Sequence, residues 1–400
     1  MKQTLIWIGA LVLGAVLGLT GLSWLLSVMD FVAAVYTRLF QLLAVPTIVL
    51  AVVTTLASLG TQKESGRIFR HTLGYTLLTT FAAAAVGLLL YLLIAPEGLD
   101  LASVTAAAES ASDSQPLTVY NHLLSIVPNN VMRPFLEGNV LSLLLIAFAV
   151  GIGLSYLPES ENKATVIKGC LGLQELLFTL IRWLIWALPL GIVAFAAQLS
   201  AQISGGLIAE SLGKYVLVVL GGNFIQFFVV LPLFLLARGL NPLHVFSRML
   251  PAVLMALFTK SSAATLPVTM ESAEERLGAR REVARFVLPI CTTINMNGCA
   301  AFILVTSLFV MQSGGIQLTL PLMLIWLLIA VFAAVGNAGV PMGCYFLTFS
   351  LMSGIGAPVA VLGAILPIYT IIDMVETAEN VWSDSCVCAM TDHDLKQVQS

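Results

Sequence analysis

The sequence predicts an all-α protein that crosses a membrane several times. Of its 400 residues, 59% are hydrophobic and only 10% are charged, and the mean hydropathy is +0.99. Soluble domains carry about 25% charged residues, so the composition is that of a polytopic membrane protein. Apolar runs of about 20 residues, the length that a membrane-spanning helix needs, recur along the chain. The net charge of −3 comes with no basic stripe, which excludes nucleic acid as an expected partner.

The first 240 residues contain six candidate spans. We expect a tight turn near Asp30 between the first two, at residues 5–28 and 31–59. The fourth begins near residue 117 and is interrupted by Pro, Asn and Gly residues before it continues. The other four candidates are residues 72–94, the interrupted region from 117 to 157, residues 171–199 and residues 215–237. The interrupted region is broken at 126–130 and at 137–139.

Positive charge divides the loops into two groups. The Lys and Arg residues gather at 63–71, 163–168, 238–248 and 276–285, whereas 96–116, 200–213 and 312–319 contain none. Cytoplasmic loops carry an excess of Lys and Arg. The alternation therefore predicts a multi-pass protein of the cell (inner or plasma) membrane with both termini in the cytoplasm.

The last third of the chain does not look like ordinary spans. Residues 245–270 are apolar but carry the polar run 259–267, and both flanks look cytoplasmic, which predicts a re-entrant hairpin. Residues 320–352 have the same character around 336–341, and 283–310 is interrupted at 295–298. Broken backbone at membrane depth is tolerated where it lines a cavity, and paired broken segments indicate a transporter's binding site. Hairpin, broken span, hairpin and polar span predict an internal repeat, which would be inverted if the two hairpins enter from opposite sides.

A polar stripe occupies the final span. Asp373, Glu376, Thr377, Asn380 and Asp384 fall at i, i+3, i+4, i+7 and i+11, which places them on one helix face. An acidic group at the bilayer centre costs at least about 2.5 kcal/mol. These carboxylates are therefore expected to face a wet cavity, a cation or a polar substrate. The alternative is a solvated helix at the C-terminus.

Each broken segment also has a purely structural interpretation. Ser261 and Ser262 could be small residues at a helix contact. Asn295 and Asn297 could be hydrogen-bonded between helices, and the Gly and Pro residues at 336–341 could form a plain kink. The six cysteines show no metal-ligand or disulfide-framework spacing, and we expect them to be reduced and mostly structural.

Taken together and in order, these motifs resemble the dicarboxylate/amino acid:cation symporter family, which includes the glutamate transporters. The similarity covers nearly the whole chain and rests on residues 38–46, 125–141, 259–270, 293–298, 338–341 and 373–384. The motif Asp373-x-x-Glu-Thr-Ala-x-Asn380 is most similar to the serine/threonine branch of the family.

The resemblance implies eight transmembrane helices, two re-entrant hairpins and an elevator-type transporter. Residues 1–240 would form mainly scaffold and trimerisation spans, with spans three and six peripheral to the transport domain. Residues 241–400 would form the transport domain. The expected partners are a small amino acid substrate, membrane lipid and two further copies of the chain in a homotrimer.

The resemblance also implies a set of site residues. Asp373 would take the substrate ammonium and Asn380 its carboxylate, with further substrate contacts from Ser261, Ser262, Met296, Cys299, Val340, Glu376 and Thr377. One sodium site would use Asp384 with backbone oxygens near Cys291, Asn295 and Asn380. A second would use Thr293 and carbonyls from Ala334 to Asn337. No organic cofactor is implied.

Three positions depart from the family pattern for acidic substrates. Glu376 stands where those members have Arg, so acidic side chains should be repelled unless Glu376 is protonated or paired, with Lys260 as the nearest partner. Asn297 stands where Asp is frequent, which predicts fewer coupled sodium ions, with a proton on Glu376 or Glu379 as a substitute. Cys299 replaces a hydroxyl residue and would narrow or dry the pocket.

The predicted function is a sodium-coupled importer of small neutral amino acids, with serine and threonine first. A sodium- or proton-coupled symporter of dicarboxylates or acidic amino acids such as glutamate and aspartate stays open as an alternative. A passive ion or anion channel is the alternative from another class. An enzyme is not expected, because no His-Glu-x-x-His motif occurs and no Ser/His pair is evident among the four histidines.

Overall fold

The computed structural model describes residues 2–60, 66–99, 127–137, 140–202, 207–337 and 342–397, and every regular element in these ranges is helical. The first half contains α1 (Lys2–Leu19), α2 (Ser23–Gly60), α3 (Gly66–Ile94), α5 (Arg133–Glu137), α6 (Val140–Tyr156), α7 (Glu161–Trp186), α8 (Leu188–Gln202), α9 (Leu207–Ile225), the π-helix η3 (Gln226–Val230) and α10 (Leu231–Ala237). The second half contains α11 (Pro242–Thr259), α12 (Ser262–Glu271), the π-helix η4 (Ser272–Leu277), α13 (Arg281–Ile294), α14 (Asn297–Ser313), α15 (Leu320–Ala334), the 3-10 helix η5 (Val335–Asn337), α16 (Gly343–Gly354) and α17 (Ala360–Gln397).

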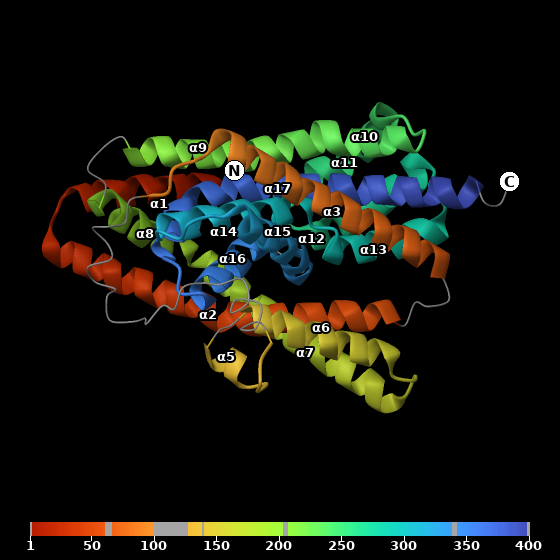
Figure 1. Cartoon of the computed structure of the whole chain (residues 1–400), viewed down its shortest axis with the longest axis horizontal. Helices are drawn as coiled ribbons and strands as arrows, with labels where there is room; N and C mark the ends of the chain where they lie inside the picture. Colours follow the sequence, from red (N-terminus) through yellow and green to blue (C-terminus); the bar gives the residue numbers. More distant parts are fainter. Residues whose placement is uncertain are drawn as a thin grey trace.

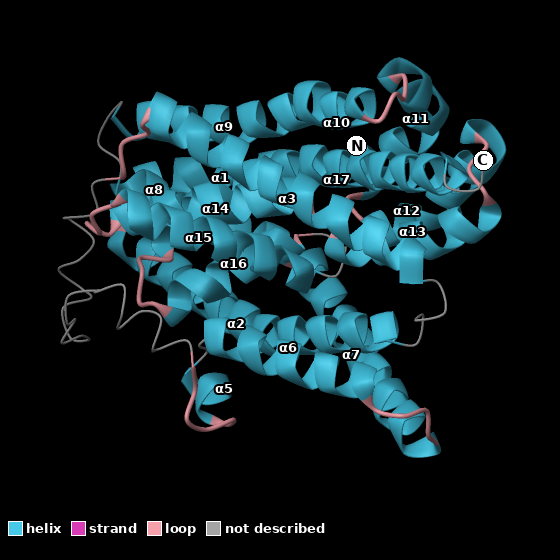
Figure 2. Cartoon of the chain, turned by 45° about the vertical axis from the view of Figure 1, so that its right-hand side comes forward, coloured by secondary structure: helices cyan, strands magenta, loops and turns pink. Residues whose placement is uncertain are grey.

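Most helices run along the long axis of the molecule (Figure 1). α2 packs against α6 and α7 on one side, and α1 packs against α8. The helix formed by α9, η3 and α10 lies on the opposite side from α6 and α7 (Figure 2). α3, α14 and α17 pack against one another between these two groups. This central position is what buries the polar face of α17.

The predicted turn near Asp30 was wrong. The chain turns earlier, where Gly21 adopts a φ of +65° and Thr20 Oγ1 donates to Leu17 O at 2.6 Å. Glycine reaches this left-handed region without steric cost. Asp30 instead lies within α2, where its Oδ1 accepts a hydrogen bond from Gln198 Nε2 of α8 at 2.8 Å. An acidic residue in an apolar stretch therefore marked a helix contact here and not a loop.

The predicted span at 171–199 is two helices, and the first begins ten residues earlier. α7 already includes Lys163, which was assigned to a loop. The Lys163 ammonium is satisfied locally, because Nζ donates to Leu157 O at 2.9 Å and to Glu159 Oε1 at 2.8 Å. α8 starts beside Pro189, and proline is favoured in the first turn of a helix because its missing N–H is not needed there.

The predicted breaks within 259–267 and 295–298 are confirmed, whereas residues 338–341 of the third predicted break lie outside the described residues. α11 ends at Lys260, which adopts a left-handed φ of 55°, and Ser261 then caps α12 by accepting the Ala264 N–H at 3.2 Å. α13 and α14 are separated by Asn295 and Met296, whose backbone is not helical. α15 and η5 end before the break that precedes α16.

α17 is bent by 70° between its segments Ala360–Leu366 and Ile368–Lys396. Pro367 lies at this bend, and proline has no N–H to continue the helical hydrogen-bond ladder. The longer segment carries the polar stripe toward the centre of the molecule.

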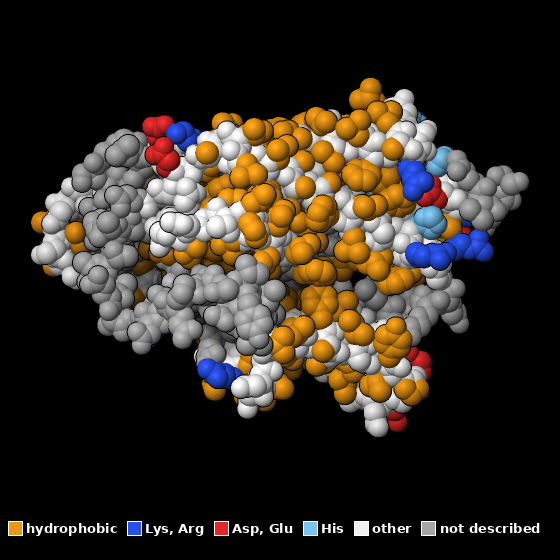
Figure 3. All heavy atoms as spheres, viewed as in Figure 1, with side chains coloured by type: hydrophobic (Ala, Val, Ile, Leu, Met, Phe, Trp, Pro, Cys, Tyr) orange, Lys and Arg blue, Asp and Glu red, His pale blue; other side chains and the backbone are white. Residues whose placement is uncertain are grey.

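Membrane insertion is supported by length and composition. Within the described residues, five helices are long and apolar enough to cross a bilayer, or six if the bent α17 is one span. Hydrophobic side chains are spread over the middle of the visible face, and the visible charged side chains lie toward its edges (Figure 3). The number of eight spans stays a prediction. The predicted loops at 96–116 and 200–213, the basic residue Lys63 and the break at 137–139 fall wholly or partly outside the described residues.

Candidate functional site

The polar face of α17 is buried in the interior of the molecule. The exposed fractions are 4% for Asp373, 1% for Glu376, 5% for Thr377, 3% for Asn380 and 1% for Asp384. This burial excludes the solvated C-terminal helix considered from the sequence. Each of these polar groups must find its partner within the protein or in something that the protein binds.

The break between α13 and α14 supplies one set of partners. Asn295 Nδ2 donates to Asp384 Oδ1 at 2.8 Å and to Ser383 Oγ at 3.0 Å, and Asn297 Nδ2 also donates to Ser383 Oγ. Asn380 Oδ1 accepts the Gly298 N–H at 3.0 Å. This N–H belongs to the first turn of α14, where backbone donors have no partner within the helix. The side chains of α17 thus accept hydrogen bonds from the residues at the break between α13 and α14.

Residues at the end of η5 and before α16 approach the same face. Met342, just before α16, donates its N–H to Asp373 Oδ2 at 3.3 Å. Asn337 at the end of η5 donates from Nδ2 to Cys299 Sγ at 3.0 Å and to Met296 Sδ at 3.7 Å. Asn380 Nδ2 lies 3.5 Å from the same Met296 sulfur and 3.4 Å from the Cys299 sulfur. Residues from three segments therefore meet around Met296.

The prediction that all cysteines are reduced was wrong for one pair. Cys299 of α14 and Cys344 of α16 form a disulfide with their Cα atoms 5.5 Å apart, a separation typical of bridged cysteines. The other four are free thiols. No local spacing could reveal the pair, because 45 residues separate its members and folding brings them together. The bridge ties α16 to α14.

Tyr369 was not predicted and lies between the two acids at the centre of the site. Its hydroxyl is 3.4 Å from Asp373 Oδ1 and 3.3 Å from Glu376 Oε2. The other Glu376 oxygen, Oε1, is buried without a hydrogen-bond partner among the described residues. The carboxylate of Glu376 lies within 4.8 Å of the Cys299 and Cys344 sulfurs. The Glu376 carboxyl group is thus close to the disulfide between α14 and α16.

Lys260, between α11 and α12, approaches the same site. Lys260 interacts electrostatically with Asp373. No such interaction joins Lys260 to Glu376 among the described contacts, so the suggested pairing with Glu376 is not found. Ser261 and Ser262 follow directly at the start of α12 and are buried, with exposed fractions of 8% and 2%. Val340 lies outside the described residues.

The predicted sodium ligands are only partly brought together. Asn295, Asn380 and Asp384 share one neighbourhood through the hydrogen bonds above, and the Cys291 carbonyl accepts the Asn295 N–H at 2.8 Å. Thr293 is turned back to its own helix, since its hydroxyl donates to Ile290 O at 2.8 Å. Ala334 is buried at the end of α15, close in sequence to Asn337.

Two further residues of the network were missed. Ser383 accepts from both Asn295 and Asn297, and Thr79 of α3 donates from Oγ1 to Asn295 Oδ1 at 3.1 Å. Ser383 follows Asn380 by one helical turn, and Thr72, Thr76, Thr79 and Thr80 share a stripe of buried residues. Helical spacing could have found both, because each lies on the same face as other polar residues.

Gly298 permits the close contact between α14 and α17. A Cβ at this position would lie 2.8 Å from Glu376 Cα and 2.9 Å from Asn223 Oδ1. We expect Gly298→Ala to lower the free energy of unfolding by about 1–3 kcal/mol through overpacking, as measured by thermal unfolding in detergent. Gly221→Ala is the control, because its Cβ would meet only Leu90 Cδ1 at 3.4 Å. Equal unfolding temperatures for the two variants would contradict this account of the contact.

Comparisons with known proteins agree with this architecture. A profile described as the sodium:dicarboxylate symporter family matches residues 4–394. The chain is 30% identical over 398 residues to the neutral amino acid transporter B(0) of Oryctolagus cuniculus, which covers 90% of this chain and 73% of the relative. It is 28% identical over 428 residues to the neutral amino acid transporter A of Bos taurus, with 96% and 79% covered.

A third relative is the putative sodium-dependent excitatory amino acid transporter glt-6 of Caenorhabditis elegans, at 27% identity over 410 residues, with 93% and 75% covered. The family and these relatives are transporters and not enzymes. The profile match spans almost the whole chain, including the breaks after α11 and α13 and the polar helix α17. The chain therefore belongs to the sodium:dicarboxylate symporter family.

Proposed function

We propose that this protein imports small neutral amino acids, serine and threonine first, together with sodium. The observation that carries the proposal is Glu376, a buried carboxylate with one oxygen unpartnered among the described residues, at the centre of the candidate site. Two of the relatives are named neutral amino acid transporters. A hydroxyl on the substrate can donate a hydrogen bond to Glu376, which a second carboxylate cannot do.

The two ends of an amino acid find opposite charges in this site. Asp373 is the acceptor for the substrate ammonium, and the Asn380 amide and the N–H groups at the start of α16 are donors for its carboxylate. The N-terminal end of a helix carries partial positive charge, which favours a carboxylate there. Ser261 and Ser262 at the start of α12 offer a second such end from the first hairpin.

Charge argues against an acidic side chain on the substrate. Two like charges about 4 Å apart at an effective dielectric near 20 repel by about 4 kcal/mol, or about three decades in affinity. Lys260 interacts electrostatically with Asp373. We therefore place dicarboxylates, glutamate and aspartate below serine as substrates.

Transport itself is proposed to follow the elevator scheme that the family resemblance implies. Residues 241–400, with the two hairpins as gates, would move against a scaffold built mainly from residues 1–240 within a homotrimer. Both termini would face the cytoplasm, and eight spans would cross the plasma or inner membrane. The alternative second coupled ion is a proton on a buried acid.

Sodium coupling is proposed to involve Asp384. Its Oδ1 is held by Asn295 Nδ2 at 2.8 Å, and carbonyls freed at the broken span are suitable ligands for a hard cation. We expect Asp384→Asn to weaken sodium activation of serine uptake by about tenfold or more, because the charge of the ligands sets the affinity of such sites. The check is the sodium concentration that gives half-maximal uptake. An unchanged value would remove Asp384 from the site.

Uptake by reconstituted vesicles tests the proposed function as a whole. An inward sodium gradient should drive labelled serine to a higher concentration inside than outside. Unlabelled threonine should compete, and aspartate should not. Serine uptake that ignores the sodium gradient, or that aspartate suppresses more strongly than threonine does, would contradict the proposal. Uptake that never exceeds the external concentration would favour a channel.

A further inference from the structure

We propose that Glu379 is the carboxylate ligand of a sodium site between α17, η3 and the start of α14, in which it supplies the negative charge that Asn297 lacks. The inference rests on the proposed sodium-coupled function and deepens it. It also reverses an expectation from the sequence, namely that an asparagine at position 297 means fewer coupled ions.

Glu379 is the most completely buried acid of α17 and has no described partner. Its exposed fraction is 0%, and neither carboxylate oxygen accepts a hydrogen bond from any described residue. Asp373 and Asp384, by contrast, each accept at least one. A buried carboxylate without a donor is strongly disfavoured unless a cation or a proton accompanies it.

The neighbours of Glu379 on α17 fix its location. Ser383, one turn later, accepts hydrogen bonds from Asn295 and Asn297. Trp382, three residues later, donates from Nε1 to Phe227 O of η3 at 3.1 Å. Residues at i+3 and i+4 flank the face on which residue i lies. The Glu379 side chain therefore lies between the broken span and η3.

Amide side chains on α9, η3 and α14 leave their oxygen atoms, and not their N–H groups, unpaired in the interior. Asn223 Nδ2 donates to Val219 O at 2.7 Å, and Gln226 Nε2 donates to Thr79 O at 3.0 Å. A backbone carbonyl can only accept, so these bonds fix the orientation of both amides. Asn223 Oδ1, Gln226 Oε1 and Asn297 Oδ1 are all buried without a partner among the described residues, as is Thr80 Oγ1.

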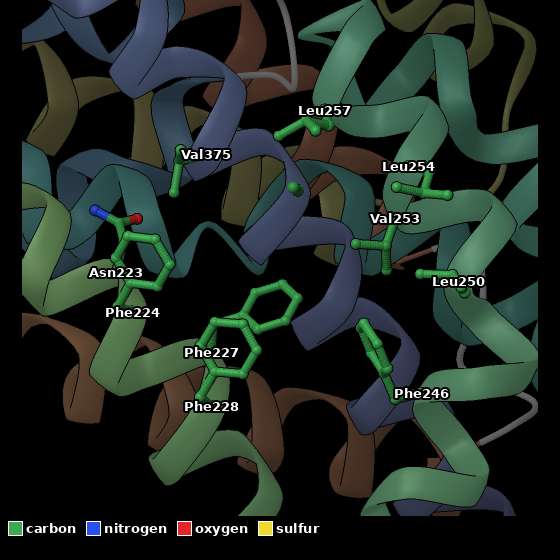
Figure 4. A pocket seen from close by; sticks show the side chains of 11 residues that line it. Asn223, Phe224, Phe227, Phe228, Phe246, Leu250, Val253, Leu254, Leu257 and Val375 are labelled. Carbon is green, nitrogen blue, oxygen red and sulfur yellow. The ribbon is translucent and has the colours of Figure 1, made fainter.

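The Asn223 side chain lies beside the turn of α17 that precedes Glu379. Its Oδ1 would be 2.9 Å from a Cβ built on Gly298, and Glu376 Cβ would be 3.0 Å from the same point. Glu376 precedes Glu379 by one turn. Figure 4 shows the Asn223 amide and Val375 of α17 on the same side of an apolar pocket of about 210 Å³ whose other lining residues are mainly Phe and Leu.

A cation fits this cluster better than a proton. A protonated Glu379 would offer one O–H and satisfy one acceptor, whereas the amide oxygens of Asn223, Gln226 and Asn297 each need a partner. A hard monovalent ion binds several oxygens at once, and a single carboxylate matches its charge. Glu379 therefore places on α17 the charge that an aspartate at position 297 would place on α14.

Sodium binding to the purified full-length protein tests the inference without any amino acid. We expect Glu379→Gln to shift the sodium dependence of thermal stabilisation by about tenfold or more to higher concentration. In vesicles the ratio of radioactive sodium to serine entering should fall by one ion. Adding Asn297→Asp to Glu379→Gln should restore both values, because α14 then supplies the carboxylate that α17 has lost.

Controls separate a sodium ligand from a structural residue. Glu210→Gln removes an exposed acid that pairs with Lys214 and should leave the sodium dependence unchanged. Gln226→Met removes a neutral oxygen at similar length and should weaken sodium binding less than Glu379→Gln does.

If Glu379→Gln does not fold, Gln226→Met decides: weaker sodium binding supports the site, and unchanged binding overturns it. Unchanged sodium affinity and ion ratio in Glu379→Gln overturn it as well. If serine proves not to be a substrate, the thermal measurement still decides whether Glu379 binds sodium.

Discussion

Asp373→Asn is expected to weaken serine binding by at least about 100-fold and to abolish measurable uptake. Removing one partner of a buried ion pair costs about 3–5 kcal/mol, and 1.4 kcal/mol is about tenfold in affinity. In the proposed pose the substrate ammonium would lose its only direct carboxylate partner at this position. Binding is measured by calorimetry on the purified protein in sodium.

The asparagine variant should fold, because its side-chain oxygen can still accept the Met342 N–H that Asp373 Oδ2 accepts at 3.3 Å. Asp30→Asn is the matched control, since Asp30 accepts a comparable hydrogen bond from Gln198 but lies away from the polar face of α17. Asp30→Asn should bind serine normally. Serine binding in Asp373→Asn within threefold of the unmodified protein would contradict the assigned role.

Glu376→Arg is expected to reverse the preference between serine and aspartate. The substitution exchanges a repulsion of about 4 kcal/mol for an attraction to the substrate's second carboxylate, and Arg can engage a carboxylate with two hydrogen bonds. The ratio of aspartate to serine affinity should rise by at least about 100-fold. Competition against labelled serine and aspartate measures it.

Glu376→Gln separates the loss of the repulsion from the gain of an attraction to Arg. It removes the repulsion without adding a cation, so aspartate should gain less than in Glu376→Arg. Glu376 is 1% exposed and close to the Cys299–Cys344 bridge, so the folding of Glu376→Arg must be checked by its unfolding temperature. A well-folded Glu376→Arg protein with unchanged selectivity would show that this side chain does not face the substrate.

The breaks in the last third were predictable because a few local residues cause them. Pro, Gly and paired Asn residues interrupt apolar stretches, and the structure places non-helical backbone at Asn295 and Met296 and a left-handed turn at Lys260. Asp30 and Lys163 were misassigned because charge was taken to mark a loop. Each instead has a partner, Gln198 from a distant helix and Glu159 one turn away.

The acids of the candidate site were found from one helix alone, because helical spacing fixes which residues share a face. Their partners were harder to find. Thr79, Gln226 and the Cys299–Cys344 bridge depend on packing between segments far apart in sequence. Glu379 was named only as an acid that might carry a proton. Its relation to the amide oxygens became visible once the orientation of Asn223 and Gln226 was known.

The central claim is that the buried acids of α17 form a site shared by an amino acid and sodium. Calorimetric titration of serine into the purified protein, with sodium and with an equal concentration of choline, tests it most directly. We predict that serine binds at least about tenfold more tightly in sodium than in choline. We also predict that Asp373→Asn abolishes serine binding in both salts. Equal serine affinity in sodium and choline, or binding that survives Asp373→Asn, would contradict the account.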